Sequence, residues 1–111
     1  MNLGLLEASP NDSEQVSQMF DANLLAHEQV NAYLMQQGVN IGAWPMSVVY
    51  PPDATWVDHH AQEHTLWAGI FNIDNPGDLN QYDLNNPRQF ARWIDLHVQH
   101  HQLVNQVLGL V

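Results

Sequence analysis

The chain contains no cysteine and very little positive charge. Without cysteine it has no disulfide framework and no thiolate metal site. Lysine and arginine together number 2, against 12 aspartate and glutamate residues, so the formal net charge is -10. The cations are Arg88 and Arg92. Binding to a phosphate backbone or to an anionic membrane surface needs several cations on one face. We therefore expect neither direct nucleic-acid binding nor membrane binding.

Long apolar runs are also missing. The apolar stretches span only a few residues, well short of a membrane-crossing helix. Residues 1–4 lack the charged start and long apolar core of a signal peptide. We expect a soluble protein made in the cytoplasm.

The chain nevertheless has what a folded domain needs. It has 111 residues, of which 45% are hydrophobic, including 4 Trp, 3 Tyr and 3 Phe. This length and composition predict one domain over residues 1–111 with a substantial core. Asparagine and glutamine number 22, against 14 charged residues. An amide-rich surface suits packing against other protein, so we expect a homo-oligomer or a multi-copy assembly.

An internal repeat of about 37 residues organises the chain. Residues 56–66 recur as residues 93–103, and a weaker copy covers residues 19–31. The apolar positions of each copy follow helical spacing. Cap signals place the units at residues 12–38, 52–72 and 86–109, with Asn86 before Pro87 and Gly109 after the last helix.

The fold class predicted is therefore all-α: a small bundle of three main helices built on the repeat. Residues 39–51 read as an extended arm between the first two helices, and residues 72–85 as a turn-rich linker. Linkers of this length allow the helices to run parallel or antiparallel. A constant register suggests a rough threefold arrangement, whereas an up-down-up bundle is the commoner one.

Histidines four residues apart lie on the apolar face of the repeat. Two such side chains point the same way on a helix, and such a pair can coordinate a transition metal such as Zn or Fe. The candidate metal ligands are His60, Glu63, His64, His97 and His101. A haemerythrin-like carrier or redox role is the corresponding functional class, although the sequence lacks that family's fourth helix and its His-x-x-x-x-Asp ligands.

A buried polar layer is the alternative that we favour from the sequence. In it the same side chains hydrogen-bond to one another and fix the register of the helices. Its expected members are Asn23, His27, His60, His64, His97 and His101. His59 and His100 fall at the margin of the apolar face, where we expect half-exposed side chains.

No catalytic arrangement is present. The sequence has no serine in a glycine-flanked nucleophile elbow, no phosphate-binding loop, no dinucleotide-binding turn and no lysine. We expect no enzymatic activity. We also expect no cofactor, except for a transition metal such as Zn or Fe if the metal-binding interpretation holds.

The segment of residues 83–110, centred on Trp93, His97 and His101, resembles small acidic proteins encoded among the structural genes of tailed bacteriophages. The resemblance implies a non-enzymatic virion component of the capsid, portal or tail region, made in the host cytoplasm and bound to other virion proteins or to itself. The arm is the expected partner-binding segment, through Trp44, Pro45, Met46, Val48 and Tyr50.

Overall fold

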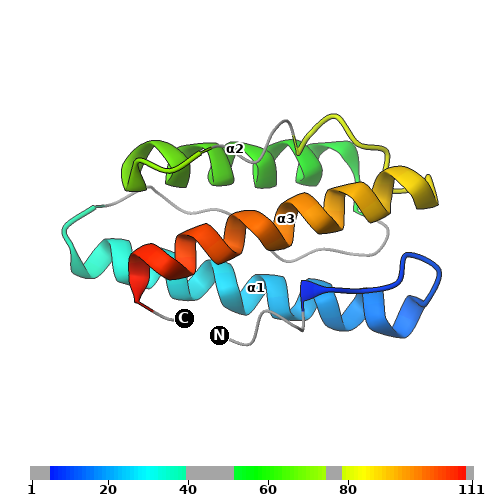
Figure 1. Cartoon of the computed structure of the whole chain (residues 1–111), viewed down its shortest axis with the longest axis horizontal. Helices are drawn as coiled ribbons and strands as arrows, with labels where there is room; N and C mark the ends of the chain where they lie inside the picture. Colours follow the sequence, from blue (N-terminus) through cyan, green and yellow to red (C-terminus); the bar gives the residue numbers. More distant parts are fainter. Residues whose placement is uncertain (1–5, 40–51, 75–78, 110–111) are drawn as a thin grey trace.

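Three helices make up the fold of the described part of the chain, residues 6–39, 52–74 and 79–109 (Figure 1). In this computed structural model, α1 spans Ser13–Gln36, α2 spans Ala54–Phe71 and α3 spans Pro87–Leu108. The described ranges contain no strand, so the all-α prediction is confirmed. The expected arm, with Trp44, Pro45, Met46, Val48 and Tyr50, lies outside the described residues.

A polar side chain caps the start of each helix. The carboxylate of Asp12 accepts backbone N–H bonds at the start of α1, and Asp53 does the same for α2. Asn86 caps α3, where Pro87 needs no hydrogen-bond partner. At the other end of α3, Gly109 has a φ of 72°, a left-handed conformation that glycine adopts without strain. The helix boundaries thus follow from local chemistry.

All three helices run in the same direction. In Figure 1 each begins at the same end of the bundle and finishes at the opposite end. Contacts between helices also indicate a parallel arrangement, because pairs of contacting side chains are separated by a nearly constant number of residues. His27 contacts His64 and Asn23 contacts His60, each pair 37 residues apart. An antiparallel pair would give separations that change along the helix, so the up-down-up arrangement is not adopted.

The parallel register stacks the core in layers. Phe20, Trp56 and Trp93 form an aromatic layer in which every pair is in ring contact. Val30, Trp67 and Val104 belong to a second apolar cluster farther along the helices. The segment of residues 79–86 closes the first cluster, because Leu79 and Leu84 are buried there. Polar side chains fill the core between these clusters.

No helix in the described ranges combines the length and apolar character needed to cross a membrane.

Candidate metal centre

Two polar layers lie between the apolar clusters. The first, which we call the Asn23 layer, consists of Asn23, His60 and His97. The second, the His27 layer, consists of His27, His64 and His101. All six side chains are at most 1% exposed. Helical spacing explains the stacking, because residues four apart on one helix occupy adjacent layers of the same face.

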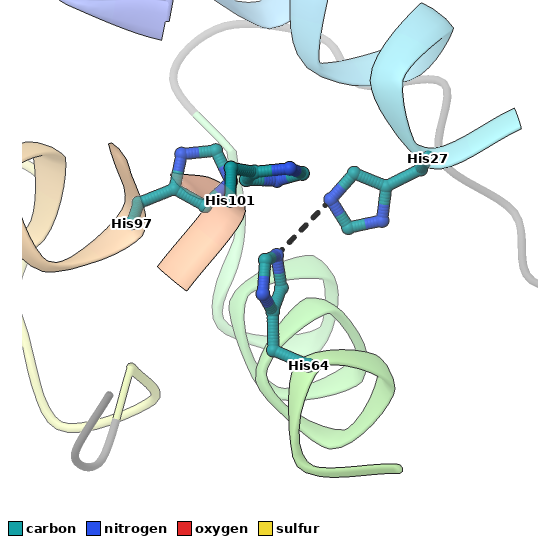
Figure 2. A group of neighbouring side chains, drawn as sticks. All are labelled: His27, His64, His97 and His101. Atoms are coloured by element: carbon teal, nitrogen blue, oxygen red, sulfur yellow. Dashed lines mark hydrogen bonds between the residues drawn. The ribbon is translucent and has the colours of Figure 1, made fainter. Parts of the chain in front are cut away.

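Four imidazoles converge at this level of the bundle. His27, His64, His97 and His101 each offer one ring nitrogen, and the four nitrogens lie within 4.8 Å of one another. Figure 2 shows the rings pointing toward a common centre from all three helices. Nε2 of His27 is 3.1 Å from Nε2 of His64, and Nε2 of His97 is 3.1 Å from Nε2 of His101.

These separations match the spacing of metal ligands. Zinc binds histidine nitrogen at about 2.0–2.1 Å, so two nitrogens on a tetrahedral ion are about 3.3–3.4 Å apart. The 3.1 Å pairs are within a few tenths of an ångström of that value. Two nitrogens on one ion are at most about 4.2 Å apart, and the four nitrogens lie within 4.8 Å of one another, so the group must contract somewhat to coordinate one ion.

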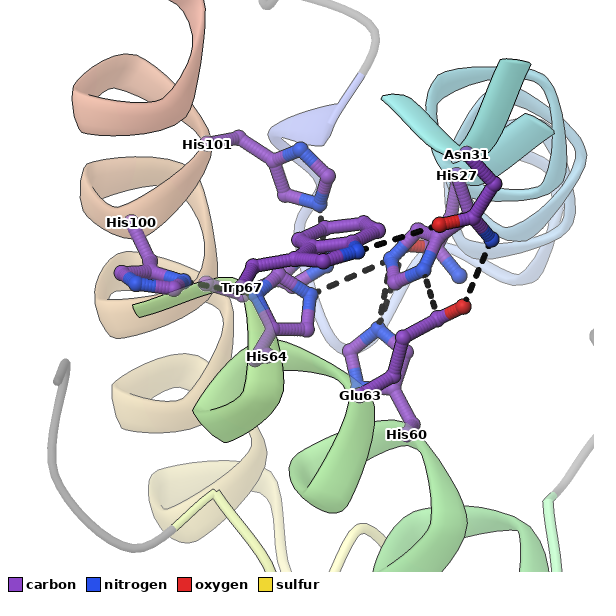
Figure 3. Close-up of polar contacts among 10 residues, drawn as sticks. His27, Asn31, His60, Glu63, His64, Trp67, His100 and His101 are labelled. Carbon is purple, nitrogen blue, oxygen red and sulfur yellow. Dashed lines mark hydrogen bonds and ion pairs between the residues drawn. The ribbon is translucent and has the colours of Figure 1, made fainter. Parts of the chain in front are cut away.

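The side chain of His27 is oriented by a carboxylate. Nδ1 of His27 contacts Oε1 of Glu63, which leaves Nε2 of the same ring directed at the centre. Asn31 donates from Nδ2 to Oε2 of Glu63 at 2.9 Å, and Trp67 donates from Nε1 to Oδ1 of Asn31 at 3.1 Å (Figure 3). A carboxylate behind a ligating histidine is a frequent outer partner at metal sites, where it fixes the ring and raises its basicity.

His64 also has an outer partner. Its Nδ1 lies 2.7 Å from Nδ1 of His100, so its Nε2 remains available to the centre. The expectation of a half-exposed His100 is wrong, because this side chain is fully buried against α2. His59 is exposed. The sequence places His59 and His100 alike at the margin of the apolar face. Only the packing of α3 on α2 shows that His100 is buried and His59 is not.

Burial keeps the histidines neutral. Desolvation lowers the pKa of His101 to about 3 and that of His100 to about 4. It also lowers the pKa of His27, His60, His64 and His97 well below the usual value, with repulsion from neighbouring imidazoles acting in the same direction. Neutral imidazole is the form that binds metal, so the site has its ligands ready at neutral pH.

Glu63 shows the opposite shift. Burial raises its pKa to about 7, although the hydrogen bond from Asn31 favours the ionised form. A cation held by His27 would stabilise the Glu63 carboxylate by electrostatic attraction.

Hydrogen bonds alone leave the polar layers incompletely satisfied. Nε2 of His27 is 3.1 Å from Nε2 of both His60 and His64. In a neutral imidazole that atom carries one proton or one lone pair, so it serves only one of these neighbours well. Within the described residues, three buried polar atoms have no hydrogen-bond partner in the Asn23 layer: Nδ2 of Asn23 and Nδ1 of both His60 and His97. Buried groups of this kind are rare in folded proteins.

The structure rearranges the predicted ligand set. His64, His97 and His101 belong to the four-histidine group, as the metal interpretation expected. His27, which the sequence placed only in the polar layer, joins them. Glu63 contacts His27 instead of pointing at the centre, and His60 lies beside the group without being part of it. The partnership of Glu63 with α1 depends on the parallel register and could not be found by spacing along one helix.

No family model, curated protein or solved structure matches this chain. The resemblance of residues 83–110 to phage structural proteins therefore remains a prediction.

Proposed function

We propose that this protein binds one transition-metal ion in the core of its parallel three-helix bundle. The ligands are His27, His64, His97 and His101. One observation carries the proposal: four buried imidazoles from three helices place a nitrogen each within 4.8 Å of one another. A hydrogen bond from Nε2 of His27 serves one of its two imidazole neighbours, whereas one cation accepts a lone pair from every ring.

The ligand chemistry selects the class of ion. Imidazole suits Zn, Cu, Fe and Ni, whereas Mg and Ca prefer oxygen ligands. Four neutral ligands leave the charge of the ion uncompensated. Glu63 supplies the nearest negative charge, through Nδ1 of His27. It is the only acidic residue that is buried in the described ranges.

The role that we propose for the ion is structural. Catalytic zinc sites keep a coordination position open to water or substrate. Here the four ligands are at most 1% exposed, so solvent does not reach the proposed site directly. The ion would hold the three helices together. This role is compatible with the non-enzymatic virion component expected from the sequence, which remains a prediction along with its assembly through the arm.

Elemental analysis of the untagged protein tests the proposal. We expect about one equivalent of transition metal per chain after dialysis at pH 7. Light scattering on the same sample gives the assembly mass, which tests the predicted oligomer independently. Added metal should also raise the unfolding temperature. A ligand at about 1000 times its dissociation constant stabilises the native state by about 4 kcal/mol.

Matched variants locate the ion. His64→Ala and His101→Ala should lose it, whereas His59→Ala should retain it, because His59 is exposed on the same helix as His64. Circular dichroism shows whether each variant is still helical. If a variant unfolds, titration of the wild type with Cu²⁺ gives a second test, because the ring of Trp67 lies 4.4 Å from that of His27 and its fluorescence should be quenched stoichiometrically. A wild type that retains no metal and shows no saturable quenching refutes the proposal.

A further inference from the structure

We infer that His60 is a fifth imidazole ligand, so the centre selects an ion of five or six coordination over a strictly tetrahedral one. This inference rests on the proposed metal site and concerns which ion the site prefers. It assigns a role to the one buried histidine of the two layers that the four-histidine group leaves out.

His60 lies against members of the four-histidine group. Its Nε2 is 3.1 Å from Nε2 of His27, the same separation that joins His27 to His64. Its ring centroid is 4.5 Å from that of His64 and 4.8 Å from that of His97. His60 also occupies on α2 the position that His97 occupies on α3, because the two residues are separated by the 37-residue register. His97 is already a member of the group.

The nitrogen separations leave room for a fifth ligand. With a metal–nitrogen bond of about 2.05 Å, a nitrogen separation of 3.1 Å corresponds to an angle of about 100° at the ion. This angle lies between the value of about 109° at a tetrahedral ion and that of about 90° at a six-coordinate ion, so these separations fit either geometry. The Nε2 pair of His60 and His27 has the same separation as the pairs His27–His64 and His97–His101, so His60 lies at ligand spacing from His27.

A hydrogen-bonding role explains His60 less well. Its Nε2 is 3.3 Å from Oδ1 of Asn23, which is a long contact, and its Nδ1 has no partner among the described residues. Its Nε2 is also 3.1 Å from Nε2 of His27, but that atom is equally close to Nε2 of His64, so these hydrogen bonds return little for the desolvation of the His60 ring.

Cobalt substitution distinguishes the two geometries. The visible absorption of Co²⁺ is intense when the ion is four-coordinate, intermediate when five-coordinate and weak when six-coordinate. We expect the Co²⁺-loaded wild type to absorb at the intermediate or weak level. His60→Asn should raise the molar absorbance several-fold, because it removes one ligand. Asparagine is the residue that α1 carries at the equivalent position, so this substitution keeps a hydrogen-bonding side chain. His59→Asn, on the exposed face of the same helix, should leave the spectrum unchanged.

Each outcome has a defined meaning. A wild-type spectrum at the four-coordinate level that His60→Asn does not alter would overturn the role of His60 and leave the metal site in place. Failure of the wild type to bind Co²⁺ and Zn²⁺ would refute the proposed function and this inference with it. X-ray absorption of the wild type supplies a measurement that needs no variant: five or six light-atom neighbours support the inference, and four contradict it.

Discussion

Acid is expected to unfold the chelator-treated protein well above the pH at which its carboxylates titrate. The core holds six buried histidines whose pKa values are all lowered by desolvation. In the unfolded chain the same groups have pKa values of about 6.5. Below that pH the unfolded state binds more protons than the folded one. Stability is therefore complete above about pH 6.5 and falls as the pH falls.

The magnitude follows from the number of histidines. Each histidine that stays neutral in the fold but takes up a proton in the unfolded chain lowers the free energy of unfolding. The loss is about 0.8 kcal/mol at pH 6 and about 2 kcal/mol at pH 5. Six such groups amount to about 5 kcal/mol at pH 6 and about 12 kcal/mol at pH 5. Glu63 acts in the opposite direction, because its pKa is raised to about 7 and the fold therefore gains stability as this group takes up a proton. Between pH 7 and pH 5 the protonation of Glu63 raises the free energy of unfolding by about 2 kcal/mol. The net loss of about 10 kcal/mol is comparable with the whole stability of a small domain.

The assay is thermal unfolding followed by circular dichroism in the presence of a chelator, at intervals between pH 7.5 and 5. We expect the unfolding temperature to fall steeply below pH 6.5, with loss of helix before pH 5. His59→Gln serves as the control, because this histidine is exposed and its removal should leave the profile unchanged. An unfolding temperature that stays constant from pH 7.5 to 5 would refute the argument, since it would mean that the imidazoles are hydrated in the folded state.

Three further predictions concern single side chains. Glu63→Gln should weaken metal binding by about 10- to 100-fold in competition titrations, because it removes the carboxylate behind His27, whereas Glu28→Gln removes an exposed charge and should have little effect. Trp93→Ala should lower the free energy of unfolding by about 3–5 kcal/mol in urea, because the ring is fully buried and its Nε1 donates to the carbonyl oxygen of Leu79; a loss below 1 kcal/mol would contradict the aromatic layer. Asn86→Ala should cost about 1 kcal/mol in the same assay by removing the cap of α3, and an unchanged midpoint would show that this cap is dispensable.

The helices could be predicted because local chemistry determines them. Asp12, Asp53 and Asn86 cap in the structure as their residue types suggest, and Gly109 ends α3. Helix direction could not be predicted in this way. Linkers of about fifteen residues are long enough for either direction, so the choice depends on which faces pack best together.

In the candidate site, too, features set within one helix could be predicted and features set by packing between helices could not. Spacing on one helix identified His60 with His64 and His97 with His101 as pairs. The contact of His27 with Glu63 joins α1 to α2, and that of His64 with His100 joins α2 to α3. Both contacts appear only once the helices are parallel and in register. Sequence reasoning on separate helices therefore found most of the ligands and missed the side chains that orient them.

The composition of the core itself argues for a bound cation. A single buried polar residue is enough to fix the register of a helical bundle, and each additional one replaces apolar packing that would stabilise the fold more. Here six histidines, two asparagines and one glutamate are buried in the described residues. The apolar layers on either side show that these helices pack well with Phe20, Trp56 and Trp93, or with Val30 and Val104. Register alone does not require so many polar groups. The proposed ion would give four of these groups a role, and the binding free energy of a structural metal, about 10–16 kcal/mol in small zinc domains, would stabilise the bundle despite the apolar packing that they displace.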